Sequence, residues 1–549
     1  MAKVVFKSYN QGQIQLFPSR LDERISENSP VRLIDSIVNN LDISDLISTY
    51  ESGGTSAYHP RMLLKIVFYA YMNNLYSCRK IAKALDENVH YMWLSGSQYP
   101  SFSTINRFRS EHVKECVNKL FTQVVMMLVE MGQISLEVSY IDGTKIESVA
   151  NKYTFVWKKS VEKNKIKLEK KIQSILSQIE EGIAQDNATN DEETSTPIDS
   201  EQLLKRIEEL NHSNKASTKE QKKQLLELEK HQLKLQEYEE KLDILAKRNS
   251  YSKTDKDATF MRMKEDAMNN GQTKPGYNIQ IGTENQYITN FGLYQTPGDT
   301  TTLESFLSLH KARHGNLPKS VCADAGYGSE ENYELLEQEG IEAFVKYNYF
   351  HKEQKKTFCN NPFLQENLYY NQQENYFVCP MGQHMSYIGK KKSTSDNGFV
   401  SYLSLYKAQN CGGCPLRGQC HNSKEDRVIQ VNHKLREYKR KARERLSSPQ
   451  GLEHRSKRPI EPEAVFGQIK FNKQYKRFRH KSLKKVNMDF AILIMAFNIK
   501  KLHNNTEKQR CTDGFKEKTT VTCFVFVVFA LFSLKMGGRQ IFLKKWLLR

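Results

Sequence analysis

The sequence predicts a mixed α/β protein in which helical segments precede and interrupt the part that carries the strands. Three observations lead to this prediction. Apolar residues recur at helical spacing near the N-terminus, a long stretch rich in Lys, Glu, Gln and Leu follows later, and segments on both sides of that stretch alternate apolar and polar residues. A chain of 549 residues, 38% of them hydrophobic, can bury more than one core, so we expect several domains.

The composition favours a polyanionic partner. Lys and Arg number 82 against 63 Asp and Glu, a formal net charge of +19, which favours nucleic acid, although a basic protein can also be merely soluble. The cysteines are thinly spread and no secretory leader is recognised, so we expect a reduced, cytoplasmic protein. The apolar run at residues 521–534 is shorter than the roughly 20 residues of a spanning helix, so no membrane partner is expected.

Three helices are predicted in the N-terminal part. The first covers residues 60–75 and begins with proline, the second follows Ser77 as N-cap, and the third begins after Ser101. A helix-turn-helix places its last helix in the major groove of DNA, which predicts DNA contacts by Arg107 and Arg109. The alternative is a small helical bundle whose arginines face solvent.

A helical insertion is predicted at residues 158–248. Apolar residues recur there at intervals of three, four and seven, and a polar break at residues 186–200 divides the pattern. This spacing is typical of an antiparallel helical hairpin or a coiled coil. Charged residues fill the other faces, so we assign the segment a structural role.

Two aspartates are predicted to end strands of one sheet. Asp142 follows an alternation of apolar and polar residues and precedes Gly-Thr, and Asp324 follows SVCA and precedes Ala-Gly-Tyr-Gly. The segment 277–299 alternates around Gly and Asn turns, as paired antiparallel strands do. Two strand-end carboxylates can converge on Mg²⁺, which prefers such oxygen ligands, but each Asp is also an ordinary turn residue. Asp257 and Asp299 are secondary candidates.

A third carboxylate is predicted in a helix within RPIEPEAVFGQIKFNKQYKRFRH, residues 458–480. Pro462 suits the first turn of that helix, and Lys470 lies on the same face as Glu463. Glu461 and Glu463 are two residues apart and cannot both point at one site, so we choose Glu463. In isolation, a surface glutamate would be the simpler interpretation.

Four cysteines between Asp324 and Glu463 form a candidate zinc site. They are Cys379, Cys411, Cys414 and Cys420. One Cys-x-x-Cys pair with two flanking cysteines could hold tetrahedral Zn²⁺ in a closed structural site. A zinc ribbon would show two close pairs, so ordinary reduced thiols remain the alternative.

Three motifs carry a family resemblance. YIDGTKIESVANKYTF, ADAGYGSEENYELL and EPEAVFGQIK resemble the acidic motifs of DDE transposases from bacterial insertion sequences, and TDKDATFMRMKEDAMNNGQTKPGYN also resembles that group. The similarity spans roughly residues 15–505. It implies a ribonuclease-H-like core, a mixed sheet flanked by helices.

The resemblance also implies a domain organisation. A helical domain of helix-turn-helix type at residues 1–130 would bind DNA, and the catalytic domain would cover residues 131–505. The coiled-coil insertion, 158–248, and a cysteine-containing insertion, 355–430, would interrupt the catalytic domain. Residues 506–549 form an atypical tail.

The resemblance implies a mechanism as well. Asp142, Asp324 and Glu463 would be the catalytic residues and would bind two Mg²⁺ ions, for which Mn²⁺ can substitute, during in-line attack on a phosphodiester. Basic residues of the third motif would hold the DNA backbone, with Tyr475 and Phe478 between them for packing or stacking. These basic residues are Lys470, Lys473, Lys476, Arg477 and Arg479. A solvated helix is the alternative.

Part of the superfamily shows Tyr, two residues, Arg, three residues, Glu, six residues and Lys around the glutamate. The interval from Glu463 to Lys470 fits, but Arg458 lies one residue too far upstream and the Tyr has no match. The implied partners are double-stranded DNA, as terminal inverted repeats and target, and a second copy of the chain, in the bacterial cytoplasm and at the nucleoid when bound. A metal-dependent nuclease of the same fold and an inactive DNA-binding protein remain alternatives.

Overall fold

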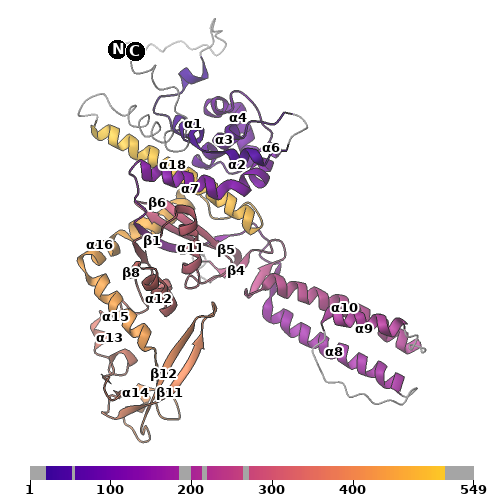
Figure 1. The fold of residues 1–549 in the computed structure, drawn as a ribbon, viewed down its shortest axis with the longest axis vertical. Coiled ribbons are helices and arrows are strands. Elements are labelled where there is room, and N and C mark those ends of the chain that lie inside the picture. Colours follow the sequence, from indigo (N-terminus) through magenta and orange to yellow (C-terminus); the bar gives the residue numbers. More distant parts are fainter. Residues whose placement is uncertain (1–19, 52–55, 185–198, 213–218, 264–270, 514–549) are drawn as a thin grey trace, which may run out of the picture. The chain divides into compact units, whose positions relative to one another are not determined.

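The computed structural model describes residues 20–51, 56–184, 199–212, 219–263 and 271–513 (Figure 1). Its mixed α/β composition, with a mixed sheet and helices, confirms the predicted fold class at that level. The described residues divide into two compact units: those within Leu136–Val486 form one, and the described residues before and after them form the other. We expected the catalytic part to extend to residue 505, but the chain from Asn487 groups with the N-terminal helices instead.

The N-terminal unit is helical. Its elements are η1 (Leu21–Arg24), α1 (Pro30–Asn40), α2 (Ser44–Ser48), α3 (Pro60–Met72), α4 (Cys78–Glu87), α5 (Val89–Ser95), α6 (Phe102–Arg107), the π-helical η2 (Phe108–Val113), α7 (Lys114–Glu130) and most of α18 (Leu483–Asp513). The predicted helices are confirmed as α3, α4 and α6. Ser101 caps α6, because its hydroxyl accepts a hydrogen bond from the Thr104 amide at 3.2 Å.

A buried polar network explains why α18 groups with these helices. Asp489 of α18 is fully buried and accepts a hydrogen bond from the Tyr71 hydroxyl. The Arg109 guanidinium donates to the same hydroxyl at 2.6 Å and to the Tyr76 carbonyl at 3.1 Å. Buried polar groups require such partners, so the network fixes α18 against α3 and η2.

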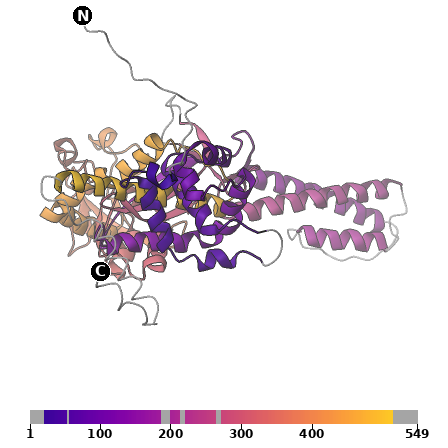
Figure 2. The same cartoon turned by 90° about the horizontal axis from the view of Figure 1, so that it is seen from above.

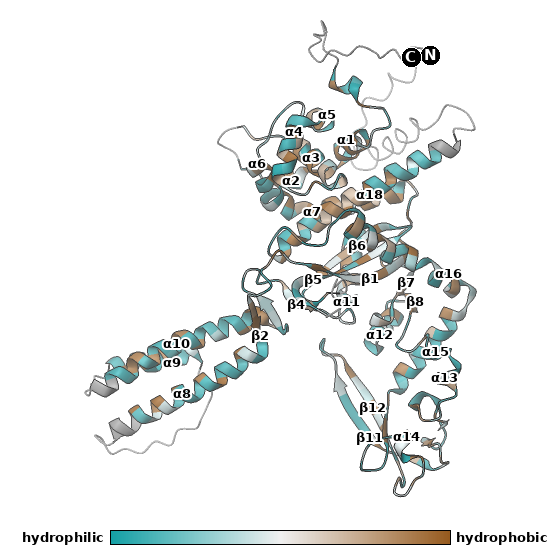
Figure 3. Cartoon of the chain, turned by 180° about the vertical axis from the view of Figure 1, so that it is seen from behind, coloured by the Kyte–Doolittle hydropathy of each residue, from teal (hydrophilic) through white to brown (hydrophobic). Residues whose placement is uncertain are grey.

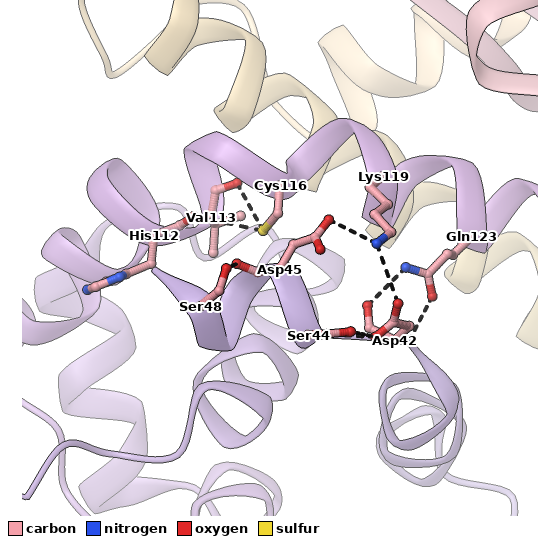
Figure 4. A network of polar contacts seen from close by, with 9 residues as sticks. All are labelled: Asp42, Ser44, Asp45, Ser48, His112, Val113, Cys116, Lys119 and Gln123. Atoms are coloured by element: carbon pink, nitrogen blue, oxygen red, sulfur yellow. Dashed lines mark hydrogen bonds and ion pairs between the residues drawn. The ribbon is translucent and has the colours of Figure 1, made fainter. Parts of the chain in front are cut away.

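A second, more exposed network holds α2 and α7 together (Figure 4). The Lys119 ammonium lies 2.9 Å from the Asp45 carboxylate and 3.5 Å from that of Asp42. The Gln123 side chain bonds the backbone of Asp42 in both directions, at 2.7 and 3.0 Å. Hydrogen bonds from Ser44 are the main reason that the pKa of Asp42 is lowered. The contacts fix the start of α2 to the side of α7.

The second unit contains a six-stranded sheet. Its strands are β1 (Val138–Glu147), β4 (Thr259–Arg262), β5 (Thr273–Glu284), β6 (Tyr287–Tyr294), β7 (Ser320–Ala323) and β8 (Glu342–Val345). β1 pairs antiparallel with β5 and parallel with β7, and β7 pairs parallel with β8. The predicted hairpin is confirmed as β5 and β6, whose turn has positive φ at Asn285 and Gln286.

Helices and short turns complete this unit around the sheet (Figure 1). They are α11 (Leu303–His314), η3 (Ala325–Tyr327), α12 (Glu330–Gln338), α15 (His433–Ser447), α16 (Pro449–Lys457), the π-helical η5 (Pro459–Glu463), α17 (Ala464–Gly467) and the π-helical η6 (Gln468–Asn472). One core joins the strands β1, β7 and β8 to α11, α12 and α15. The core therefore fixes β1, which carries Asp142, and β7, which Asp324 follows.

The predicted helical insertion consists of α8 (Lys158–Ala184), α9 (Ser200–His212) and α10 (Lys219–Leu245), which lie side by side in Figure 2. Two short strands, β2 (Phe155–Trp157) and β3 (Ser250–Ser252), pair at its base. Leucines and isoleucines of all three helices form one buried seam, and many of the other residues of these helices are hydrophilic (Figure 3). This burial agrees with the structural role predicted from the spacing.

The cysteine-containing segment forms a separate five-stranded antiparallel sheet. Its strands are β9 (Tyr370–Asn371), β10 (Tyr376–Val378), β11 (His384–Thr394), β12 (Val400–Ala408) and β13 (Val428–Val431), with α13 (Lys356–Cys359), η4 (Gln365–Asn367) and α14 (Arg417–Cys420) beside it. Among the residues that the structure describes, no helix is both long and apolar enough to cross a membrane. The apolar run 521–534 lies outside the described residues.

Candidate active site

The two aspartates lie next to each other at the end of a parallel strand pair. Ile141 of β1 pairs with Ala323 of β7, and Asp142 and Asp324 are the residues that follow. The prediction that Asp142 ends its strand is wrong, because β1 continues to Glu147 through antiparallel pairing with β5. The two carboxylates therefore lie where β7 ends, beside the middle of β1.

The helical segment that carries the third carboxylate also differs from the prediction. Pro462 lies inside a continuous helical run and not in a first turn, because α16 leads directly into η5. Glu461 is 6% exposed and accepts a hydrogen bond at 2.7 Å from the amide of Gln286 in the β5–β6 turn. The Glu463 side chain is 49% exposed and contacts Arg458 instead. The two glutamates therefore point to different places.

Arg458 brings the three predicted catalytic residues together. Its Nη2 lies 3.5 Å from Asp142 Oδ1 and 3.7 Å from Asp324 Oδ2, and its Nη1 lies 2.6 Å from Glu463 Oε1. A carboxylate within β1, one directly after β7 and one in η5 thus surround a single guanidinium. Its Nε is buried and has no hydrogen-bond partner among the described residues.

A π-helical turn explains how Arg458 reaches this position. Arg458 and Glu463 are five residues apart, one more than in the superfamily pattern. A π-helix bonds residue i to i+5, so it places residues five apart in the relation that an α-helix gives to residues four apart. The η5 turn, Pro459–Glu463, therefore absorbs the additional residue and keeps the two side chains in contact.

The electrostatics of this site are unbalanced. Three carboxylates surround one arginine, and the side chains of Asp324 and Asp142 are 52% and 14% exposed. Lys346 lies near the same groups: partial burial, and then the charge of Arg458, lower its pKa, whereas Asp324 opposes the shift. Carboxylates in excess, open to solvent on one side, can accept further cations.

Polar residues of β5 support the strand beside Asp142. Asp299 accepts hydrogen bonds from the side chains of Asn278 and Gln280, both at 2.8 Å. A Cβ at Gly143 would lie within 3 Å of Gln280 and Asp299, so only glycine fits next to Asp142 without displacing them. Asp257, the other secondary candidate, accepts the Leu483 amide at 2.8 Å instead.

Sequence reasoning gave too little weight to Arg458 and overlooked Lys346 and the amides of Asn278 and Gln280. The sequence shows an Arg five residues before Glu463, but these two side chains come together only if the turn between them is π-helical. Lys346 directly follows β8, the strand beside β7, so its position could have been found from the strand order.

The predicted DNA-binding residues of the third motif separate into two groups. Lys470 is buried and donates a hydrogen bond at 2.6 Å to Thr144 of β1, and Lys473 is also buried. Lys476, Arg477 and Arg479 are exposed, and Arg477 also lies 3.7 Å from Glu147. The run beyond η6 is not helical, because it extends beside the end of β1. Tyr475 and Phe478 are both buried and pack against each other.

In the N-terminal unit, Arg107 is exposed at the end of α6, as predicted. Arg109 is not: its side chain lies in the buried network with Tyr71 and also contacts Cys78 Sγ at 2.7 Å. The prediction that Arg109 contacts DNA therefore disagrees with its burial. Residues two apart lie about 200° apart around a helix, so Arg107 and Arg109 cannot both face outward. Arg107 remains a candidate.

The four cysteines line one small pocket with His421 and Arg427. Arg427 donates hydrogen bonds from its amide to Cys411 Sγ at 3.4 Å and from Nη1 to Cys420 Sγ at 3.0 Å. Among the described residues, no group of three or more His, Cys, Asp or Glu side chains is arranged to hold a metal ion, here or around Arg458. A zinc site at these four cysteines stays a prediction.

Two family models match parts of the chain. Residues 378–503 match the model described as Transposase DDE domain, and residues 19–111 match Transposase domain (DUF772). These matches support a DDE-type transposase. DDE transposases generally depend on a divalent metal, which agrees with an excess of carboxylates around Arg458. The first match includes Glu463 but neither aspartate, so the meeting of all three is an independent observation. A comparison with curated proteins gave no match.

Proposed function

We propose that the chain is the transposase of a bacterial insertion sequence. It binds the terminal inverted repeats of the element in double-stranded DNA as a homodimer, cleaves the donor and joins the 3′ ends to target DNA. The contact of Arg458 with Asp142, Asp324 and Glu463 carries this proposal, because side chains from three distant motifs meet there. The mixed sheet with its flanking helices suits the proposed ribonuclease-H-like core.

The three carboxylates fit Mg²⁺ chemically, since they are hard oxygen donors that already surround a cation, the guanidinium of Arg458. Bound Mg²⁺, or Mn²⁺ in its place, would activate water or a 3′-hydroxyl and stabilise the leaving oxygen. Asp142, Asp324 and Glu463 would hold the ions. Arg458, once separated from the carboxylates, would contact a phosphate oxygen, for which its planar guanidinium is suited.

Cationic residues near the site would hold the DNA. Lys476 and Arg479 are exposed and would contact phosphates, as would Arg107 in the N-terminal unit. Lys470 and Lys473 are buried, and we propose that Lys470 acts as a positioning residue through its bond to Thr144, two residues after Asp142. Arg477 is exposed beside Glu147 at the end of β1 and would also contact a phosphate.

The test is incubation of the purified protein and Mg²⁺ with supercoiled plasmid that carries the DNA flanking the reading frame. We expect cleavage at the element ends followed by strand joining. Glu463→Gln should remove both reactions and leave end binding within a few-fold, whereas the matched control Glu461→Gln should retain both. Cleavage without joining would indicate a nuclease, binding without cleavage an inactive DNA-binding protein, and loss of binding in Glu463→Gln a structural role.

A further inference from the structure

A two-stranded ribbon extends from the sheet of the cysteine-containing segment. β11 and β12 pair over their whole length, but β10 covers only residues 384–386 of β11, and β13 covers only residues 404–407 of β12. Beyond these residues, the two strands have no further partner strand in the described part of the chain. Both edges of the ribbon are thus unpaired along residues 388–403.

Three consecutive lysines line this ribbon. Lys390, Lys391 and Lys392 are all exposed, and none has an ion-pair partner in the described ranges. Because side chains alternate along a strand, Lys390 and Lys392 share a face, and Tyr402, which is 58% exposed, pairs directly opposite Lys392. By contrast, lysines of the nearby α15 are paired: Lys441, for example, lies 2.8 Å from Glu337.

The tip of the ribbon is tied to the part of the unit that carries Asp324. Ser395 and Asn397 donate hydrogen bonds to the two carboxylate oxygens of Glu331, at 3.1 and 2.9 Å. Glu331 lies in the first turn of α12, which follows Asp324 after the short η3 turn. The lysines and the acidic site are therefore linked through one helix.

We propose that this ribbon binds the phosphate backbone of duplex DNA beside the acidic site, through Lys390, Lys391 and Lys392, with Tyr402 in contact with the sugar or base face. The proposal rests on the proposed function. DNA presents a dense array of negative charge, and a two-stranded ribbon has dimensions that fit its major groove. The unpaired ammonium groups lose no ion pair on binding, and the anchored tip keeps the bound duplex near Asp324.

The test compares two triple variants of the full chain. One is Lys390→Gln with Lys391→Gln and Lys392→Gln. The control, Lys167→Gln with Lys170→Gln and Lys171→Gln, removes the same charge from exposed positions of α8. Binding of a fluorescent duplex is measured by anisotropy over a range of salt concentrations. Each lost phosphate contact lowers the slope of log K against log salt by about 0.9, so the ribbon variant should lose roughly 2 to 3 in slope and the control nearly nothing.

The outcomes separate this proposal from the proposed function. If the wild type neither binds nor cleaves DNA, the proposed function fails. If the wild type does both but the ribbon variant keeps its salt slope, or both triple variants lose it equally, the ribbon proposal is overturned. Increased aggregation with unchanged binding would mean that the lysines only protect exposed strands. Introducing Asp324→Asn into wild type and ribbon variant should remove cleavage and leave the difference in slope.

Discussion

Two arginines of this chain interact with acidic side chains, but the two sites differ in burial and in charge balance. Arg109 meets Tyr71 and, through it, the carboxylate of Asp489 in the interior of the helical unit. Arg458 meets three carboxylates, two of which are about half exposed. The first arrangement balances one positive charge with one negative charge and excludes water. The second leaves negative charge in excess and open to solvent.

The difference teaches how to distinguish a structural ion network from a functional one. Buried, balanced charges can be removed only at a cost in stability, because the remaining partner stays without compensation. Like charges in excess at a solvent-open site repel one another, and a bound cation would relieve that repulsion. We therefore assign Arg109 to the fold and the Arg458 cluster to chemistry.

The largest expected effect is on catalysis. Asp324→Asn keeps the volume of the side chain but removes one charge from the cluster. If the metal stabilises the transition state less well by several kcal/mol, the cleavage rate should decrease on the order of a thousandfold. The free energy of unfolding should stay almost unchanged, since the side chain is 52% exposed. Single-turnover cleavage and urea unfolding measure the two quantities, and a large loss of stability would contradict the assignment.

Asp489→Asn should produce the converse result. The change leaves Arg109 without its carboxylate in a buried place, which costs about 3–5 kcal/mol in the free energy of unfolding. Chemical denaturation measures this loss. Tyr71→Phe is the milder comparison, because it removes the two hydrogen bonds of the hydroxyl but keeps both charged side chains, and it should cost about 1–3 kcal/mol. An Asp489→Asn protein of wild-type stability would show that the network is not structural.

His310 extends the comparison to a buried side chain whose ring nitrogens have no hydrogen-bond partner among the described residues. Burial, with His314 and Arg313 nearby, lowers its pKa to about 3. The folded state therefore resists protonation of His310. Its contribution to the free energy of unfolding is complete above the pKa that histidine has in the unfolded chain, and it falls as the pH decreases below that value. Between pH 7 and 5 the expected loss is about 2 kcal/mol. His310→Leu should reduce this pH dependence, whereas the exposed His384→Leu should not.

The smallest effect concerns affinity for the cation. Arg458→Gln removes the positive charge that competes with a metal for three carboxylates, so Mn²⁺ should bind about tenfold more tightly, a gain of about 1.4 kcal/mol. Titration followed by electron paramagnetic resonance measures the change. Arg109→Gln is the control and should not alter Mn²⁺ affinity. Weaker binding in Arg458→Gln would show that the guanidinium organises the carboxylates and does not compete.

Much of this organisation could be predicted from the sequence. Apolar periodicity located α3, α4, α8, α10 and the β5–β6 hairpin, because burial on one face leaves a regular pattern. Sheet register could not be predicted, since it depends on pairing between distant strands. As a result Asp142 was assigned to the end of its strand, although pairing with β5 continues beyond it.

The candidate site was predicted in its carboxylates but not in its arginines. Asp142, Asp324 and Glu463 stand in recognisable local motifs. Arg458 appeared one residue out of place because sequence spacing assumes an α-helix, whereas the chain forms a π-turn there. The Arg109 error has a different origin: Arg107 and Arg109 are two residues apart, which puts them on nearly opposite faces of a helix.

The central claim is that Asp142, Asp324 and Glu463 together bind divalent cations. Crystals of the protein with DNA ends and Mn²⁺, measured at a wavelength where manganese scatters anomalously, test it most directly. The account predicts anomalous density within about 2–2.5 Å of oxygens from these carboxylates, with Arg458 turned away from them. Manganese bound elsewhere, with Arg458 still between the three side chains, would contradict it.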